Sequence, residues 1–261
     1  MSMNPWLYSQ ICHTDDLYWP AGCGRGGEAM FSNEKLVILD ADGTTIDAFT
    51  AIAKTFCRHG MDIGDLERFQ KRHNLFKYLG GAKEFPLNLK QQLTTTKRSK
   101  LLGTLTEVYR EEALLYPGMR ELIGRLIADP DIRIGVITRN ITHQPEATLR
   151  TLFAREGIDV GGFDFLLHLP LKENKAGSFA WVRAKYRVNP ARCYVCGDEH
   201  KDYRAAVATG MHPFIASYGF EDHARLARKY TVPEAVISDT PQALGWRLSN
   251  ALGMCGAFPA P

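Results

Sequence analysis

The stretch from Lys35 to Asp47, KLVILDADGTTID, decides the fold of this chain. Leu36 to Leu39 form an unbroken apolar run, which is too short for a buried helix and is typical of a central parallel strand covered on both faces. Asp40 and Asp42 follow directly, and at Gly43 the backbone can turn. Because sites in open α/β sheets lie at the carboxyl ends of the strands, this acidic strand end is where we expect a site.

The composition is that of a globular chain. Its 261 residues are 45% hydrophobic and 23% charged, which suffices for one full α/β core with an insertion or a small second domain. The sequence shows neither a run of eighteen apolar residues nor a basic N-terminal segment followed by an apolar one, so we expect no membrane span and no signal peptide. A cytoplasmic location is therefore predicted.

The sequence divides into three predicted parts. Residues 1–33 have no clear period and are predicted to form an irregular arm. Residues 48–115 contain no strand signal and are predicted to form a helical cap domain, inserted directly after the first strand. Residues 34–47 and 116–261 are predicted to form the α/β core, a doubly wound parallel sheet in which strands alternate with helices.

The predicted elements follow apolar periodicity and turn residues. Strands are expected at Leu36–Leu39, Ile132–Thr138, Phe163–Leu167, Cys193–Cys196, His212–Ala216 and Ala235–Ile237. Helices are expected at Ala48–His59, Asp65–Leu79, Leu87–Gln92, Lys97–Leu115, Met119–Ala128, Glu146–Glu156, Lys175–Tyr186, Asp202–Thr209, Asp222–Tyr230 and Pro241–Leu252. Cys193 and Cys196 are three apart on a predicted strand and so face opposite sides, which predicts buried thiols rather than a disulfide or a shared metal.

Polar groups follow four of the predicted strands. They are Asp40 with Asp42, Thr138 at the end of GVIT, a lysine, and Asp198 after YVCG with Asp202 four residues on. These motifs, in this order, resemble those of the haloacid dehalogenase superfamily, in its phosphatase branch. The resemblance runs from about Lys35 to Leu248, and the helical insertion takes the place of that family's cap.

The resemblance implies a covalent mechanism with a metal ion. Asp40 would attack a phosphoryl group to form an aspartyl-phosphate, and Asp42 would act as the acid and base. Asp40, Asp198 and the backbone carbonyl of Asp42 would supply hard oxygen ligands to Mg²⁺. Phosphoryl transfer depends mostly on positioning and charge neutralisation, which this set can provide.

Further residues are expected to hold the phosphate. Thr138 would hydrogen-bond the phosphoryl oxygens, and Gly43 and Thr44 lie in the turn beside the nucleophile. The family often has Asn directly after the threonine, but here Arg139 intervenes before Asn140. Arg139 is therefore predicted either as an extra phosphate contact or as a solvated side chain.

The motif lysine has two candidates, Lys172 and Lys175. The segment KAGSF places Lys175 four residues before an apolar helix position, as in many relatives, and favours it. It would balance the charge of Asp40 and the phosphate. Asp202 would orient this lysine or a metal-bound water.

The predicted cap region is basic. Residues 51–110 contain 12 Lys and Arg against 5 Asp and Glu, a net charge of +7 in a chain whose total is +3. A positive lid over a phosphate site would favour anionic substrates. Lys71, Arg72 and Lys83 flank the Gly80-Gly81 break and are predicted to contact the substrate.

The sequence thus predicts a Mg²⁺-dependent phosphomonoesterase for a small phosphorylated metabolite. The single helical cap and Tyr218-Gly219 resemble phosphoglycolate phosphatases. Two alternatives remain: a phosphomutase of the β-phosphoglucomutase kind, which shares both aspartates, and a non-catalytic module on the same scaffold that binds nucleic acid or protein. Neither a membrane nor a nucleic-acid partner is expected, and the pattern fits a monomer or an oligomer.

Overall fold

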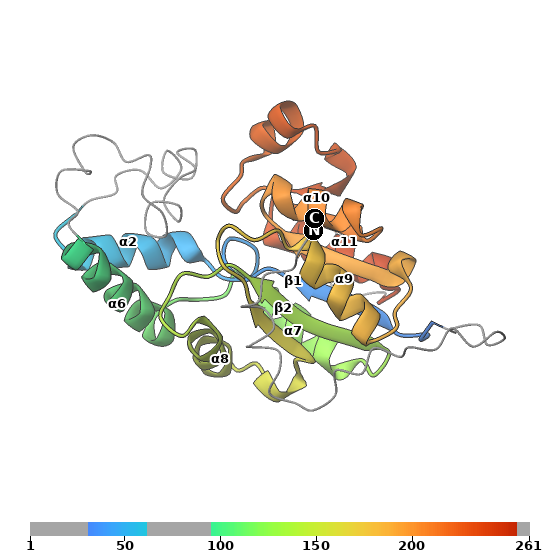
Figure 1. Cartoon of the computed structure of the whole chain (residues 1–261), viewed down its shortest axis with the longest axis horizontal. Coiled ribbons are helices and arrows are strands. Elements are labelled where there is room, and N and C mark those ends of the chain that lie inside the picture. Colours follow the sequence, from blue (N-terminus) through green and yellow to red (C-terminus); the bar gives the residue numbers. More distant parts are fainter. Residues whose placement is uncertain (1–30, 62–94, 255–261) are drawn as a thin grey trace. The chain divides into compact units, whose positions relative to one another are not determined.

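A six-stranded, all-parallel sheet forms the centre of the computed structural model, which describes residues 31–61 and 95–254 (Figure 1). Its strand order is β3-β2-β1-β4-β5-β6. The strands are β1 (Lys35–Leu39), β2 (Ile132–Thr138), β3 (Phe165–His168), β4 (Cys193–Gly197), β5 (His212–Ala216) and β6 (Ile237–Ser238). The predicted α/β class and parallel sheet are therefore confirmed.

Helices connect these strands and lie on both faces of the sheet (Figure 1). They are α2 (Ala48–Arg58), α6 (Thr95–Glu111), α7 (Met119–Ala128), α8 (Pro145–Arg155), α9 (Ala176–Lys185), α10 (His200–Ala208) and α11 (Pro241–Ala251). Short helical turns occur at η1 (Val160–Gly162), η2 (Pro190–Arg192), η3 (Arg225–Lys229) and η4 (Glu234–Val236). Among the described residues, no helix has the length and apolar character needed to cross a membrane.

The central strand β1 is buried on both faces, as its apolar run predicted. Val37 and Leu39 belong to the core that also contains residues of α7, α8 and α11. Leu36 and Ile38 belong to a second core, with residues of α9 and α10. Helices on both faces of a parallel sheet explain why the strand shows no polar alternation.

The two cysteines of β4 follow the same alternation. Cys193 lies in the core with α9 and α10, and Cys196 lies in the other core. Both are buried free thiols. The prediction of two packing cysteines, without a disulfide between them, is confirmed.

The chain reverses its direction of travel across the sheet between β1 and β4. From β1 it proceeds through β2 to β3 at one edge, and from β4 through β5 to β6 at the other. At such a point the two connections leave in opposite directions and open a crevice at the carboxyl ends of the strands. Asp40 follows β1 and Asp198 follows β4, so the topology brings the two motifs together.

Several predicted boundaries were displaced. The last strand begins at Ile237 rather than Ala235, because residues 234–236 form the turn η4. The segment predicted as a helix at 222–230 contains five residues with the wider hydrogen-bonding pattern of a π-helix. The predicted helices at 65–79 and 87–92 lie outside the described residues, as does all of the predicted arm except residues 31–33.

The described parts of the predicted cap region are α2 and α6. These two helices pack against each other and lie side by side in Figure 1. Asp47 begins α2 by accepting a hydrogen bond from the backbone N–H of Thr50, 3.1 Å away. The helix α6 also packs on α8. This contact places the C-terminal end of α6 beside the core.

A glycine in β2 gives a test of the packing between β2 and β3. A Cβ atom on Gly135 would lie 2.4 Å from the carbonyl oxygen of Phe165 and 2.5 Å from its ring, across the β2–β3 pair. We expect Gly135→Ala to lower the free energy of unfolding by ~1–3 kcal/mol, because a strand backbone cannot shift without disturbing its neighbours. Urea unfolding followed by circular dichroism measures this change.

The matched control is Gly124→Ala. Gly124 lies exposed in α7 with open space around its Cα, so alanine should raise stability by ~0.5–1 kcal/mol through helix propensity. Equal effects of the two substitutions would contradict the close approach of Phe165 to β2.

Candidate active site

Three buried carboxylates meet at the carboxyl end of the sheet. Asp40 directly follows β1, Asp198 directly follows β4, and Asp202 lies in the first turn of α10. Each offers an oxygen atom within 4.8 Å of the others. The structure therefore brings together three of the residues that the motifs singled out.

Lys175 lies between two of these carboxylates. Its Nζ atom is 2.6 Å from Oδ2 of Asp40 and 2.8 Å from Oδ1 of Asp202, and its side chain is 4% exposed. Burial lowers the pKa of Lys175, but the negative charges of Asp202 and Asp40 outweigh this and raise the pKa overall. Of the two candidates for the motif lysine, Lys175 thus lies buried between Asp40 and Asp202, whereas Lys172 is exposed.

Asp202 is fixed at both of its oxygens. Oδ1 pairs with Lys175, and Oδ2 accepts a hydrogen bond from the backbone N–H of Glu199, 3.1 Å away, as part of a capping box at the start of α10. The pKa of Asp202 is lowered because the charges of Lys175 and Arg139 outweigh the effect of burial. This geometry fits the predicted role of Asp202 in orienting the lysine.

Two glycines lie against the carboxyl group of Asp198. A Cβ atom at Gly43, where φ is +78°, would lie 2.3 Å from Oδ2 of Asp198, and one at Gly219 would lie 2.4 Å from the same atom. The backbone N–H of Phe220 donates to this oxygen at 2.6 Å. Close approach of two backbone segments explains why both positions are glycine. In the sequence, Gly219 stood out only as part of the Tyr218-Gly219 signal, and its contact with Asp198 was not predicted.

The carboxylate cluster is suited to a divalent cation. No Lys, Arg or His of the described segments lies within ion-pair distance of Asp198. Burial and the negative charges of Asp40 and Asp202 disfavour the ionised form of Asp198 and raise its pKa well above the usual range. Oxygen ligands of this hardness are those that Mg²⁺ prefers, and a bound cation would neutralise the cluster. The residues present therefore fit the predicted metal.

The side chain of Asp42 is held apart from this cluster. Oδ1 of Asp42 accepts a hydrogen bond from the hydroxyl of Tyr109, 2.7 Å away. Nδ2 of Asn140 lies 3.1 Å from Oδ1 and 2.9 Å from Oδ2. The strand ends at Leu39 and a tight turn follows, so strand alternation does not set the relative directions of Asp40 and Asp42.

The surroundings of Asp42 favour its protonated form. The pKa of Asp42 is raised to about 7 overall. Burial is the largest cause and the charge of Asp40 adds to it, whereas the hydrogen bond from Tyr109 lowers the pKa. Burial also raises the pKa of Asp40, but the adjacent Lys175 opposes that effect. The two aspartates thus lie in different electrostatic surroundings, although only one residue separates them.

Arg139 forms an ion pair that the sequence did not predict. Its Nη2 atom contacts Oε2 of Glu199, and its side chain is only 12% exposed. Arg139 is therefore not a solvated arginine, and its contact with phosphate stays a prediction. Thr138, at the end of β2, accepts a hydrogen bond through Oγ1 from the backbone N–H of Asn140, 3.2 Å away.

The other predicted phosphate contacts are found near the cluster. The hydroxyl of Thr44 lies 3.5 Å from Oδ1 of Asp198, and the backbone N–H of Gly43 donates to the carbonyl of Ile46 at 3.1 Å. The side-chain amide of Asn140 donates to Asp42. The predicted substrate contacts of the cap, Lys71, Arg72 and Lys83, lie outside the described residues.

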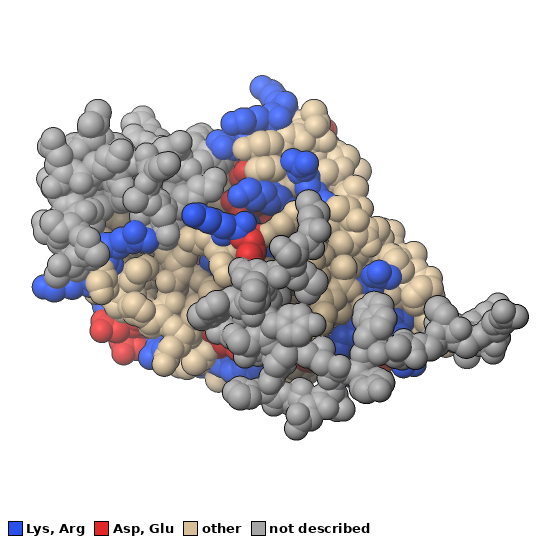
Figure 2. All heavy atoms as spheres, viewed as in Figure 1, with Lys and Arg blue, Asp and Glu red and all other residues tan. Residues whose placement is uncertain are grey.

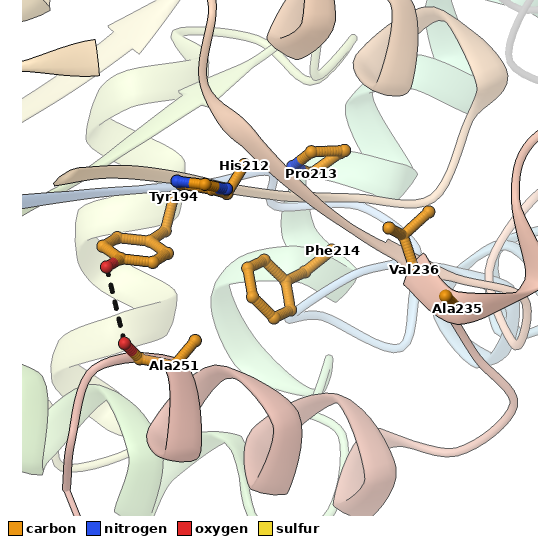
Figure 3. A pocket seen from close by; sticks show the side chains of 7 residues that line it. All are labelled: Tyr194, His212, Pro213, Phe214, Ala235, Val236 and Ala251. Atoms are coloured by element: carbon orange, nitrogen blue, oxygen red, sulfur yellow. Dashed lines mark hydrogen bonds between the residues drawn. The ribbon is translucent and has the colours of Figure 1, made fainter. Parts of the chain in front are cut away.

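A cavity of about 330 Å³ lies at the other end of the sheet (Figure 3). Tyr194 and His212, at the beginnings of β4 and β5, stack there with ring centroids 5.4 Å apart, and Phe214 also lines the cavity. The hydroxyl of Tyr194 donates to the carbonyl of Ala251 in α11, 3.4 Å away. Because this cavity is at the amino ends of the strands, it is separate from the carboxylate cluster.

Two known proteins are similar in sequence to most of this chain. A protein of Nitrosospira multiformis named phosphoglycolate phosphatase is 26% identical over 200 residues, covering 72% of this chain and 85% of the relative. A phosphoglycolate phosphatase of Aliivibrio fischeri is 23% identical over 215 residues, covering 73% and 87% respectively.

Solved structures share the fold. A predicted phosphoglycolate phosphatase from Haemophilus somnus superposes with a TM-score of 0.58 at 17% identity, covering 84% of this chain and 99% of that one. A putative β-phosphoglucomutase from Thermotoga maritima gives a TM-score of 0.56 at 17% identity, covering 83% and 99%.

A family model supplies the assignment. The model of haloacid dehalogenase-like hydrolases matches residues 34–210, a range that contains Asp40, Asp42, Thr138, Lys175 and Asp198. The resemblance stated from the motifs is thereby confirmed. This chain belongs to the haloacid dehalogenase-like hydrolase family.

Proposed function

We propose that the protein is a Mg²⁺-dependent phosphomonoesterase that acts through an aspartyl-phosphate. The observation that carries the proposal is the pairing of Asp40 with Lys175 at 2.6 Å, beside Asp198 and Asp202, while Asp42 is held separately by Tyr109 and Asn140. Asp40 thus lies beside a lysine, whereas Asp42 lies among neutral hydrogen-bond donors.

Asp40 is the proposed nucleophile. In the first step a carboxylate oxygen of Asp40 attacks phosphorus, and the bond from phosphorus to the ester oxygen breaks. The adjacent Lys175 favours the ionised form of Asp40 and attracts the phosphoryl group. Thr138, Thr44 and Arg139 lie around the same strand ends and are proposed to orient the phosphoryl oxygens.

Asp42 is the proposed acid and base. It donates a proton to the departing alkoxide and then, as a carboxylate, accepts a proton from the water that attacks the aspartyl-phosphate. In that second step the bond between phosphorus and Asp40 breaks and inorganic phosphate leaves. Because the proton is returned to Asp42, the cycle closes without another proton carrier.

Asp40, Asp198 and the backbone carbonyl of Asp42 are the proposed ligands of Mg²⁺. When bound, the ion neutralises charge between the nucleophile and the phosphoryl group. The chain contributes the orientation of these oxygens, which Gly43, Gly219 and Phe220 fix around Asp198.

A small phosphorylated metabolite is the proposed substrate. Both sequence relatives described above carry the name phosphoglycolate phosphatase, and a helical cap over residues 48–115, with Lys71, Arg72 and Lys83, would select the organic part of the substrate. We also propose the cytoplasm as the location. A panel of phosphorylated metabolites, assayed with Mg²⁺ for release of inorganic phosphate, tests the substrate class.

Two alternatives are separated by experiment. A mutase would require a bisphosphate activator and return a phosphorylated product, whereas a phosphatase releases inorganic phosphate. For a binding module, the charged surface is relevant: on the face shown in Figure 2, blue Lys and Arg side chains gather in the upper part of the described surface, with a few red Asp and Glu side chains among them. A gel shift at physiological salt tests this alternative.

Substitution of Asp40 tests the proposed nucleophile. Asp40→Asn should abolish turnover of p-nitrophenyl phosphate while leaving the unfolding transition in place, because an amide is neither a nucleophile nor a good Mg²⁺ ligand. The matched control is Asp131→Asn, an exposed residue before β2, which should keep wild-type activity. Activity of Asp40→Asn comparable to that of the control would contradict a covalent step at Asp40.

Removal of divalent cations tests the proposed metal requirement. A chelator should stop turnover, added Mg²⁺ should restore it, and Ca²⁺ should restore it poorly. Ca²⁺ takes about six to eight loosely arranged oxygens, and could draw both oxygens of Asp40 into its shell and prevent attack. Steady-state assays after dialysis measure this, and undiminished turnover in chelator would show that no divalent cation is required.

Substitution of Asp42 separates the two half-reactions. Asp42→Ala should lower turnover of an alkyl phosphate by ~10² to 10⁴-fold, the usual range for a missing acid or base. Formation of the aspartyl-phosphate from p-nitrophenyl phosphate should lose less, since that leaving group needs little protonation. Single-turnover kinetics with mass detection should reveal the trapped phosphoenzyme. Equal losses on both esters, with no trapped phosphoenzyme, would show that Asp42 is not the acid and base.

A further inference from the structure

The two oxygens of Asp42 have unequal hydrogen-bond partners. Oδ1 lies 2.7 Å from the hydroxyl of Tyr109 and 3.1 Å from Nδ2 of Asn140, whereas Oδ2 lies 2.9 Å from Nδ2 of Asn140 alone. An ionised carboxylate oxygen can accept about two hydrogen bonds. Oδ1 is therefore fully occupied, and Oδ2 keeps one lone pair that no described protein group uses.

The orientation of Asn140 is fixed by its other contacts. Its Oδ1 atom accepts a hydrogen bond from the backbone N–H of Thr142, 2.9 Å away, and contacts the hydroxyl of the same residue. A backbone N–H can only donate, so the amide oxygen must face Thr142 and the amide nitrogen must face Asp42. Asn140 is thus a donor to Asp42.

Tyr109 is held as firmly, from a different element. It is fully buried near the C-terminal end of α6, and its carbonyl accepts a hydrogen bond from Nη1 of Arg155 at 3.3 Å. Arg155 also contacts the carbonyl of Ala113, and Nε of Arg110 donates to the hydroxyl of Thr148 at 3.1 Å. These contacts tie the end of α6 to α8, so the phenol reaches Asp42 from a fixed backbone.

From this arrangement we infer that Tyr109 is a positioning residue, which with Asn140 occupies Oδ1 of Asp42 and makes Oδ2 the atom that carries the catalytic proton. The inference rests on the proposed function. In the first step the bond between Oδ2 and hydrogen breaks as the leaving oxygen takes the proton, and the electron pair stays on Oδ2. In the second step the attacking water gives its proton to Oδ2, which restores the acid.

The structure also explains why a tyrosine suits this position. A phenol has one hydroxyl hydrogen to donate, and here the hydroxyl lies 2.7 Å from Oδ1 of Asp42, on a backbone that Arg155 contacts. It therefore fixes the carboxyl group at one of its two oxygens. Tyr109 belongs to the segment predicted as the cap, whereas Asn140 follows β2 of the core.

The test compares two esters in Tyr109→Phe, which removes only the hydroxyl. For an alkyl phosphate we expect kcat to fall about tenfold to a hundredfold with KM little changed, the range for losing a hydrogen bond to a charged group. For p-nitrophenyl phosphate the loss in aspartyl-phosphate formation should be much smaller. The control is Tyr186→Phe, which removes a hydroxyl that donates to the carbonyl of Asp164 at 2.9 Å, before β3 at the other end of the sheet. It should leave both rates unchanged.

A double-mutant cycle separates positioning from general destabilisation. If Tyr109 acts through Asp42, Tyr109→Phe should add no further loss on the alkyl ester once Asp42→Ala is present. Should Tyr109→Phe fail to fold, Asn140→Ala gives the same comparison of esters. Equal losses on both esters, or additive losses in the cycle, would overturn the inference alone. A wild-type protein inactive on both esters would overturn the proposed function, and this inference with it.

Discussion

The site depends on one electrostatic constraint, which is the burial of four aspartates at the carboxyl ends of β1 and β4 with a single lysine among them. Lys175 contacts Asp40 and Asp202 and so compensates part of the negative charge. No Lys, Arg or His of the described residues lies within ion-pair distance of Asp198. Burying a carboxylate without compensation is costly, so this arrangement is suited to a bound cation, and two glycines hold Asp198 where such a cation would be shared with Asp40.

A second consequence of burial is the separation of two neighbouring carboxyl groups by their partners. Asp40 is beside a lysine, whereas Asp42 receives neutral donors from Tyr109 and Asn140. Neutral donors orient a carboxyl group without supplying the positive charge that would hold it ionised, and burial then favours the proton. A nucleophile and an acid can therefore be placed two residues apart, provided that different elements supply their partners. Here those elements are the segment before α9, the end of α6 and the loop after β2.

The fold was largely predictable because its signals are local. The apolar run of β1 and the helix at Met119–Ala128 each follow from a period or a run of a few residues, and both were found as predicted. The segment at 222–230 was less predictable: its helical pattern does not distinguish an α-helix from the π-type hydrogen bonding of η3. The strand predicted from Ala235 was also displaced, because so short an element depends on its pairing with β5.

For the candidate site, the sequence was sufficient to predict which carboxylates lie together, because motif residues at the ends of buried parallel strands must converge on one edge of the sheet. It also favoured Lys175 over Lys172, and Lys175 is the one of the two that contacts Asp40 and Asp202. Further contacts depend on tertiary packing: Arg139 pairs with Glu199, Gly219 lies against Asp198, and Tyr109 and Asn140 donate hydrogen bonds to Asp42. These contacts join residues 21 to 98 positions apart, and no local pattern encodes them, since they form only when separate helices and loops pack over the same strand ends.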